Sequence, residues 1–220
     1  MRITPLGEGL WAFPPSRDSD GGSAWLLHSA AGLAVLVDVP LLNEENLDFL
    51  RGQPPGLVVL SHRQGHGRCR RLQQALGWPV LVQEQEAYLL PTLEDRRVFA
   101  DQLELEPGLS LLWTPGPSPG SCCLHWQQGQ RDVLFSGRLF WPAAGGGLAI
   151  QRTAVTFHWP RLLASAKRLQ AWLPPQSPAE IACAAGLGPL RGGKLVGAGR
   201  RAIELVNSEH STTTLANAHF

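Results

Sequence analysis

The sequence lacks a strong charge of either sign. Charged residues make up 17% of its 220 residues, and the formal net charge is +1. A molecule with so little net charge has no general attraction for a polyanion or for an anionic membrane surface. The composition therefore disfavours nucleic acid and membranes as partners.

Long apolar runs and clustered cysteines are missing too. The longest apolar stretch, residues 24–39, is interrupted by His28, Gly32 and Asp38 and is too short to span a bilayer. The first residues lack the apolar core of a signal peptide. The 4 cysteines form no C-x-x-C pair, which is typical of reduced thiols. We expect a cytoplasmic protein without a membrane span.

Short apolar runs alternate with helical patterns along the whole chain. Strands are expected at residues 24–27, 33–38, 57–60, 79–82, 109–113, 122–126, 132–135 and 180–184. Helices are expected at residues 43–50, 68–76, 83–90, 160–173 and 200–207. This interleaving favours an α/β protein in which helices cover sheets. The sequence predicts one domain over residues 1–210 and a flexible tail over residues 211–220.

A polar, glycine-containing loop follows the apolar run at residues 57–60. Residues 61–67 read Ser-His-Arg-Gln-Gly-His-Gly, and the helical pattern begins directly afterwards. Loops between a buried strand and a helix are where α/β folds place their chemistry. The loop is therefore the first candidate site.

Four separated segments, taken in order, resemble the signature of the metallo-β-lactamase-fold hydrolases. Residues 36–38, Leu-Val-Asp, resemble the strand that ends in the family aspartate, and residues 61–67 resemble T-H-x-H-x-D-H. Residues 114–121, Thr-Pro-Gly-Pro-Ser-Pro-Gly-Ser, resemble T-P-G-H-T-P-G-S, and residues 134–140 resemble L-F-T-G-D-x-L-F. A weaker fifth match, residues 186–189, stands where the family has G-H-G-P. The resemblance covers roughly residues 3–190 and implies an αββα four-layer sandwich of two similar halves, with a hydrolytic metal site between the sheets.

The departures from that signature fall on the metal ligands. Only His62 is retained among the ligand positions of the first loop, where Gln64, His66 and Gly67 replace a histidine, an aspartate and a histidine. Elsewhere Pro117 and Leu187 replace ligand histidines, and Arg138 replaces the metal-bridging aspartate. A zinc site generally needs three nitrogen, sulfur or carboxylate ligands. We therefore expect no metal cofactor and interpret the chain as a metal-free pseudoenzyme.

The sequence leaves two alternatives for what this vestigial site does. It can bind a small anion or a protein partner, and the residues assigned to it are His62, Gln64, His66, Ser118, Ser121 and Arg138. Alternatively, Arg138 points to solvent or pairs with a carboxylate such as Asp38, and no anion binds.

Three catalytic or binding alternatives remain open. A remodelled site with one zinc or other divalent metal on His62, His66 and His158 would hydrolyse ester, thioester or phosphoester bonds. A nucleophilic pair of Cys122 or Cys123 with His62 or His125 is less favoured, because buried cysteines are commonly structural. The basic cluster Arg63, Arg68, Arg70 and Arg71 raises nucleic-acid binding as a third, disfavoured alternative. The sequence identifies neither the substrate nor the oligomeric state.

Overall fold

The first half of the chain forms a seven-stranded sheet whose strands lie in chain order. The computed structural model describes residues 2–216, with side chains through residue 210. The strands are β1 (Thr4–Pro5), β2 (Leu10–Ala12), β3 (Trp25–His28), β4 (Ala34–Val37), β5 (Gly56–Val59), β6 (Val80–Gln83) and β7 (Arg96–Phe99). Strands β1 to β4 are antiparallel, and β4 to β7 are parallel. Parallel neighbours need crossover connections, which α1 (Glu44–Arg51), α2 (Cys69–Leu76) and the 3-10 helix η3 (Glu84–Leu89) provide.

The second half forms a five-stranded sheet with the order β14-β11-β10-β9-β8. Its strands are β8 (Gln102–Glu106), β9 (Leu109–Trp113), β10 (Cys122–Gln128), β11 (Arg131–Gly137) and β14 (Glu180–Cys183). The long helix α3 (Trp159–Trp172) precedes β14, and α4 (Gly199–Ala216) follows it. The small elements are η1 (Arg17–Ser19), η2 (Arg63–His66), β12 (Trp141–Pro142), η4 (Ala144–Gly146), β13 (Leu148–Ala149) and η5 (Gly188–Leu190).

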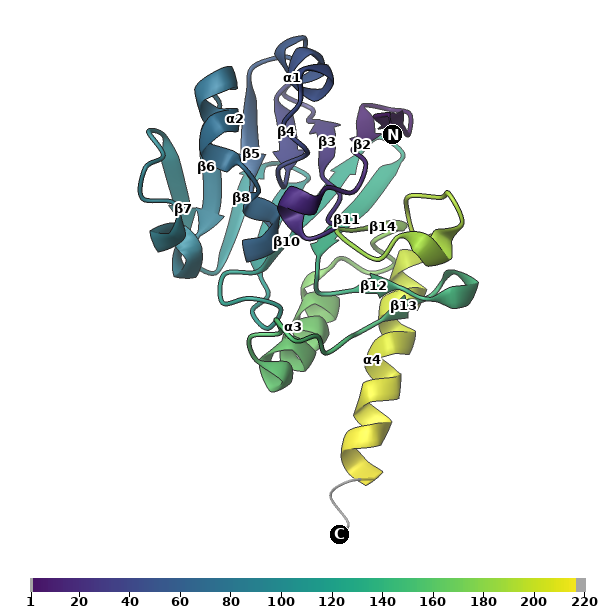
Figure 1. The fold of residues 1–220 in the computed structure, drawn as a ribbon. Coiled ribbons are helices and arrows are strands. Elements are labelled where there is room, and N and C mark those ends of the chain that lie inside the picture. Colours follow the sequence, from purple (N-terminus) through teal and green to yellow (C-terminus); the bar gives the residue numbers. More distant parts are fainter. Residues whose placement is uncertain (1, 217–220) are drawn as a thin grey trace.

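Three apolar cores define four layers. Leu50 of α1 and Leu72 of α2 pack on one face of the first sheet. Trp25 and Trp126 lie in the core between the two sheets, while α3 and α4 pack on the outer face of the second sheet. Figure 1 shows the two helix pairs on opposite sides of the sheets, with α4 extending away from the rest. The predicted αββα sandwich is confirmed.

Local signals explain why the expected elements form. Asn43 accepts a hydrogen bond from Asn46 N at 2.9 Å and so begins α1. Strand β5 is buried along its whole length, as a central parallel strand must be. The sequence missed β7 and β8, which lie at the edges of the two sheets; the first three residues of β7 are exposed, and no residue of β8 is fully buried.

The C-terminal helix is longer than the sequence indicates. The pattern predicts a helix at residues 200–207, but α4 continues to Ala216. The expected flexible tail, residues 211–220, lies partly outside the described residues. No helix within residues 2–216 combines the length and the apolar character that crossing a membrane requires.

Candidate functional site

Segments from both sheets meet where β4, β5 and β11 end. Asp38, Ser61 and Arg138 lie just beyond these strand ends. Gly137 has a φ of 55°, and a Cβ atom there would lie 2.9 Å from Ser61 Oγ. Only glycine allows this close approach in a left-handed conformation. The segments that resemble the family motifs therefore lie close together in the structure.

Asp38, Ser61 and His62 form a buried hydrogen-bonded chain. Asp38 accepts from Ser61 Oγ at 2.6 Å and from Ser61 N at 2.8 Å. His62 Nδ1 lies 2.8 Å from Ser61 Oγ and 3.4 Å from Asp38 Oδ2. Because the Ser61 hydroxyl donates its one hydrogen bond to Asp38, its oxygen accepts a hydrogen bond from His62 Nδ1–H. All three side chains are buried.

Arg138 extends this chain from the other side of His62. Its Nε donates to His62 Nε2 at 3.1 Å, and its Nη2 donates to the backbone carbonyls of Ser19 at 3.0 Å and Asp20 at 2.8 Å. Because a guanidinium can only donate, His62 Nε2 must accept and the histidine proton must reside on Nδ1. The guanidinium also lies 5.8 Å from the ring centroid of Trp141. Arg138 therefore reaches Asp38 through His62 and Ser61 instead of pairing with it directly.

Within this row of hydrogen-bonded side chains, the negative charge of Asp38 and the positive charge of Arg138 offset each other. Burial alone would raise the pKa of the Asp38 carboxyl, but the pairing with His62 and the hydrogen bonds from Ser61 outweigh burial and hold the pKa below its ordinary value. Burial lowers the pKa of Arg138, while Asp20 and Asp38 oppose that shift. An arginine remains protonated under such perturbation. The site thus contains a buried anion and a half-buried cation joined by a serine and a histidine.

Beside Arg138 lies a small pocket. Its volume is about 10 Å³, room for no more than one water molecule. The lining residues are Gln64, Pro117, Arg138, Trp141, Gln151, Thr153, Val155, Thr156 and Leu162. Gln64 and Arg138 of the predicted anion site therefore face one pocket, while Ser118 and Ser121 are not among its lining residues.

A second buried carboxylate, Glu86, organises the serine-containing loop. Its side chain accepts from Gly120 N at 3.0 Å and lies 3.6 Å from His66 Nε2 and 3.8 Å from Arg63 Nε. Ser118 Oγ lies 2.8 Å from Ser121 Oγ and accepts from Arg63 N at 3.2 Å. His66 and the two serines therefore belong to a cluster around Glu86, separate from Arg138. No feature of the sequence distinguishes Glu86 from the exposed Glu84 in the same short helix.

The cysteines are not placed for nucleophilic catalysis. Burial raises the pKa of Cys123 to about 12 and that of Cys122 well above its ordinary value, so both thiols stay protonated. His125 is engaged elsewhere: its Nε2 lies 2.8 Å from Asp132 Oδ1 and 2.9 Å from Ser177 Oγ. In a Ser-His-Asp relay the serine and the aspartate contact different ring nitrogens of the histidine. Here Ser177 and Asp132 both contact His125 Nε2, so this cluster lacks the geometry of such a relay. Among the described residues, the hydrogen bonds of Cys122 and Cys123 go to Leu60, Thr114 and Ser136 and not to His62 or His125.

Comparison with known proteins agrees with this geometry. The family model described as "Metallo-beta-lactamase superfamily" matches residues 29–177. The chain belongs to the metallo-beta-lactamase superfamily. No curated protein matches it.

Several solved structures share the superfamily fold. The BLEG-1 B3 metallo-beta-lactamase has 22% identity and a TM-score of 0.62, with 87% of this chain and 95% of that chain covered. An N-acyl homoserine lactone hydrolase with N-hexanoyl-L-homoserine bound at its catalytic metal centre has 19% identity and a TM-score of 0.63, with coverages of 88% and 98%. The archaeal superfamily protein ST1585 from Sulfolobus tokodaii has 17% identity and a TM-score of 0.58, with coverages of 95% and 87%. At these identities the likeness shows the fold alone.

The residues of this superfamily member do not fit a metal centre of the usual kind. His62 Nε2 is already bonded to Arg138, and His66 Nε2 faces Glu86. His158, the third ligand of the mononuclear alternative, begins α3 by accepting from Arg161 N at 3.2 Å. Among the described residues, no group of three or more His, Cys, Asp or Glu side chains is placed to hold a metal ion. The structure therefore does not bring His62, His66 and His158 together as ligands.

Replacing Glu86 by glutamine is expected to lower the free energy of unfolding by about 2 kcal/mol at neutral pH, because hydrogen bonds to a buried charge are lost. Burial alone would raise the pKa of the Glu86 carboxyl, but the nearby His66 and Ser118 side chains and the hydrogen bond from Gly120 N hold it below its ordinary value. A carboxyl whose pKa is lower in the folded state stabilises the protein above the unfolded-state pKa, and this contribution is lost as pH falls through the folded-state value.

Urea denaturation followed by tryptophan fluorescence at neutral and acidic pH measures this effect. The difference between the wild type and Glu86→Gln should shrink as the pH falls below 4.5, the ordinary value for glutamate. Glu84→Gln, an exposed neighbour in η3, is the matched control and should change stability by less than about 0.5 kcal/mol. Equal losses in the two variants would contradict the assigned role of Glu86.

Proposed function

We propose that this superfamily member carries no catalytic metal and acts by binding instead of metal-dependent hydrolysis. One observation supports this proposal above the others: Arg138 Nε donates to His62 Nε2. With His62 Nδ1 directed at Ser61, Nε2 is the nitrogen left for a metal. The arginine occupies the coordination direction of the one ligand histidine that the chain retains.

Electrostatics and side-chain chemistry also support the proposal that the site carries no catalytic metal. A divalent cation about 4 Å from a guanidinium is repelled by several kcal/mol at an effective dielectric constant of about 20. Pro117 and Leu187, at the positions of two family histidines, have no donor atom in their side chains. Leu187 packs against the apolar cores.

The proposed ligand of the vestigial site is a small anion or a segment of a partner protein. Arg138 supplies the positive charge and Gln64 a neutral hydrogen-bonding group at the pocket. The volume of about 10 Å³ leaves no space for an anion unless neighbouring segments move. Because Arg138 holds the Ser19 and Asp20 carbonyls, binding would displace that loop. We also propose a cytoplasmic location, supported by four free cysteines.

Metal content tests this proposal. Protein purified without chelator should contain well under one equivalent of zinc, iron or manganese by plasma mass spectrometry. Dialysis against a chelator should leave its thermal unfolding midpoint unchanged, because no ion binds the native state preferentially. One equivalent of metal that disappears in a His62→Ala variant would overturn the proposal and favour a mononuclear hydrolase.

A further inference from the structure

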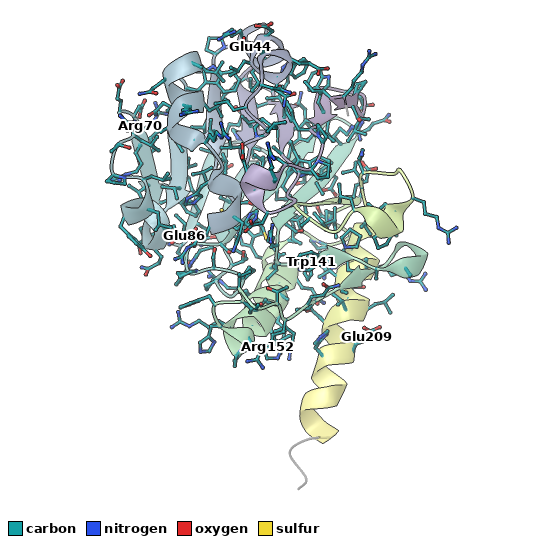
Figure 2. All side chains as sticks on the ribbon, in the orientation of Figure 1. Glu44, Arg70, Glu86, Trp141, Arg152 and Glu209 are labelled. Carbon is teal, nitrogen blue, oxygen red and sulfur yellow. The ribbon has the colours of Figure 1, made fainter. Side chains whose placement is uncertain are left out.

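An open groove lies between the beginning of α2 and the segment that links η3 to β7. Its volume is about 550 Å³, within the range of about 300–1,000 Å³ that small-molecule sites occupy. The lining residues of this α2–η3 groove are Gly67, Arg68, Cys69, Arg70, Arg71, Leu89, Leu90, Thr92 and Leu93. None of them lines the small pocket beside Arg138. Figure 2 shows Arg70 at the outer edge of the molecule beside α2, well apart from Trp141 of that pocket.

One wall of the groove is positively charged, and two of its three arginines form no ion pair within the described chain. Arg68, Arg70 and Arg71 are exposed, and no lining residue is acidic. Arg68 pairs with Asp18 at 3.0 Å, but within the described chain neither Arg70 nor Arg71 forms an ion pair. Cations near the start of a helix are disfavoured by the helix dipole, so the stability of α2 does not explain these arginines.

The opposite wall is apolar. Leu89 is 36% exposed, and Leu90 and Leu93 are only partly buried. These leucines are therefore accessible to solvent in the same groove that the arginines line. A ligand that covers them removes apolar surface from water, while the arginines hold an acidic group at its end.

We propose that the α2–η3 groove binds an amphiphilic anion, namely a carboxylate or phosphate group carried on an alkyl or acyl chain. Arg70 and Arg71 bind the acidic head, because a guanidinium donates in a fork that matches either group. The chain of the ligand lies along Leu89, Leu90 and Leu93. This inference does not depend on the metal content of the vestigial site, because the two sites share no lining residue.

The shape of the groove favours this ligand over a nucleic acid. A polyanion needs a track of positive charge along its backbone and surfaces on which bases stack. Here the positive charge is confined to one wall, the facing wall is aliphatic, and the formal net charge is only +1. A single acidic head with an apolar body matches both walls.

Calorimetric titration of the full chain with dodecanoate and with dodecyl phosphate, both below their micelle concentrations, tests the proposal. Each should bind at one site, and the tighter probe distinguishes a carboxylate ligand from a phosphate ligand. The double variant Arg70→Gln plus Arg71→Gln should weaken binding by at least about tenfold, because charge-assisted hydrogen bonds are lost. Leu89→Gln should weaken both probes as well.

The matched control removes two exposed arginines outside the groove, Arg161→Gln plus Arg201→Gln, and should leave binding unchanged. Equal binding of inorganic phosphate or of neutral dodecyl maltoside would overturn the proposal, because head and chain would not act together. Equal weakening by the control pair would show unspecific attraction and would overturn it too. Salt-sensitive binding of a single-stranded oligonucleotide without binding of either dodecyl probe would assign the arginines to a polyanion.

Discussion

Asp38→Ala is expected to lower the free energy of unfolding by about 3–5 kcal/mol, the cost of removing one partner from a buried charged network. The carboxylate accepts from Ser61 N and Ser61 Oγ, and both donors would lose their partner inside the protein. His62 would lose its link to a negative charge, and Arg138 would remain as a half-buried cation without its offsetting anion. Urea denaturation followed by tryptophan fluorescence measures the loss.

Asp48→Ala is the matched control for this variant. Asp48 pairs with Arg51 at 2.9 Å, but both side chains are exposed, and such pairs contribute at most about 1 kcal/mol. If Asp38→Ala fails to fold, Asp38→Asn keeps the shape of the side chain and should show an intermediate loss. A cost for Asp38→Asn no larger than that for Asp48→Ala would contradict the view that the buried chain stabilises this corner.

Restoring ligands is expected to create a metal site at the position where we propose that the wild type binds no metal. Gln64, Pro117 and Arg138 line the same pocket, and Arg138 contacts His62. The triple variant Gln64→His, Pro117→His and Arg138→Asp would add three donors around His62 and remove the repelling guanidinium, leaving space for an ion. It should bind about one zinc with a dissociation constant below about 1 μM, still weaker than structural zinc sites at about 10–16 kcal/mol.

Zinc stoichiometry and the rise of the thermal unfolding midpoint with added zinc measure the gain. Adding His62→Ala to the triple variant should abolish uptake, and Pro117→His alone should not bind zinc. A triple variant that folds, as judged by circular dichroism, yet binds no zinc would show that the backbone of the site has diverged along with the ligands.

Local patterns in the sequence predict most of the strands and helices, and the resemblance to the superfamily motifs predicts the four layers and the position of the site. Buried parallel strands such as β5 are continuous apolar runs, and the loop beginning at Ser61 follows such a run directly. Arg138 is found at the pocket because its motif position places it there. These features depend on a few consecutive residues, so they are visible without the fold.

The remaining features depend on contacts between distant segments. Glu86 accepts from Gly120, and no local pattern links η3 to the loop after β9. The same contact explains why Ser118 and Ser121 gather near Glu86 and Arg63 instead of Arg138. Only the tertiary structure reveals which of the two buried carboxylates, Asp38 or Glu86, the polar loop at residues 114–121 faces.

The Arg138 contacts to His62, Ser19 and Asp20 bear on how this corner of the protein assembles. An ion must be captured from the surroundings, and a protein that relies on one folds fully only where that ion is supplied. Here the contacts are made by Arg138, a residue of the polypeptide itself, and are therefore available in every molecule of the protein. On the proposal that no metal binds here, assembly of this region needs no inorganic ion and does not depend on the supply of trace elements.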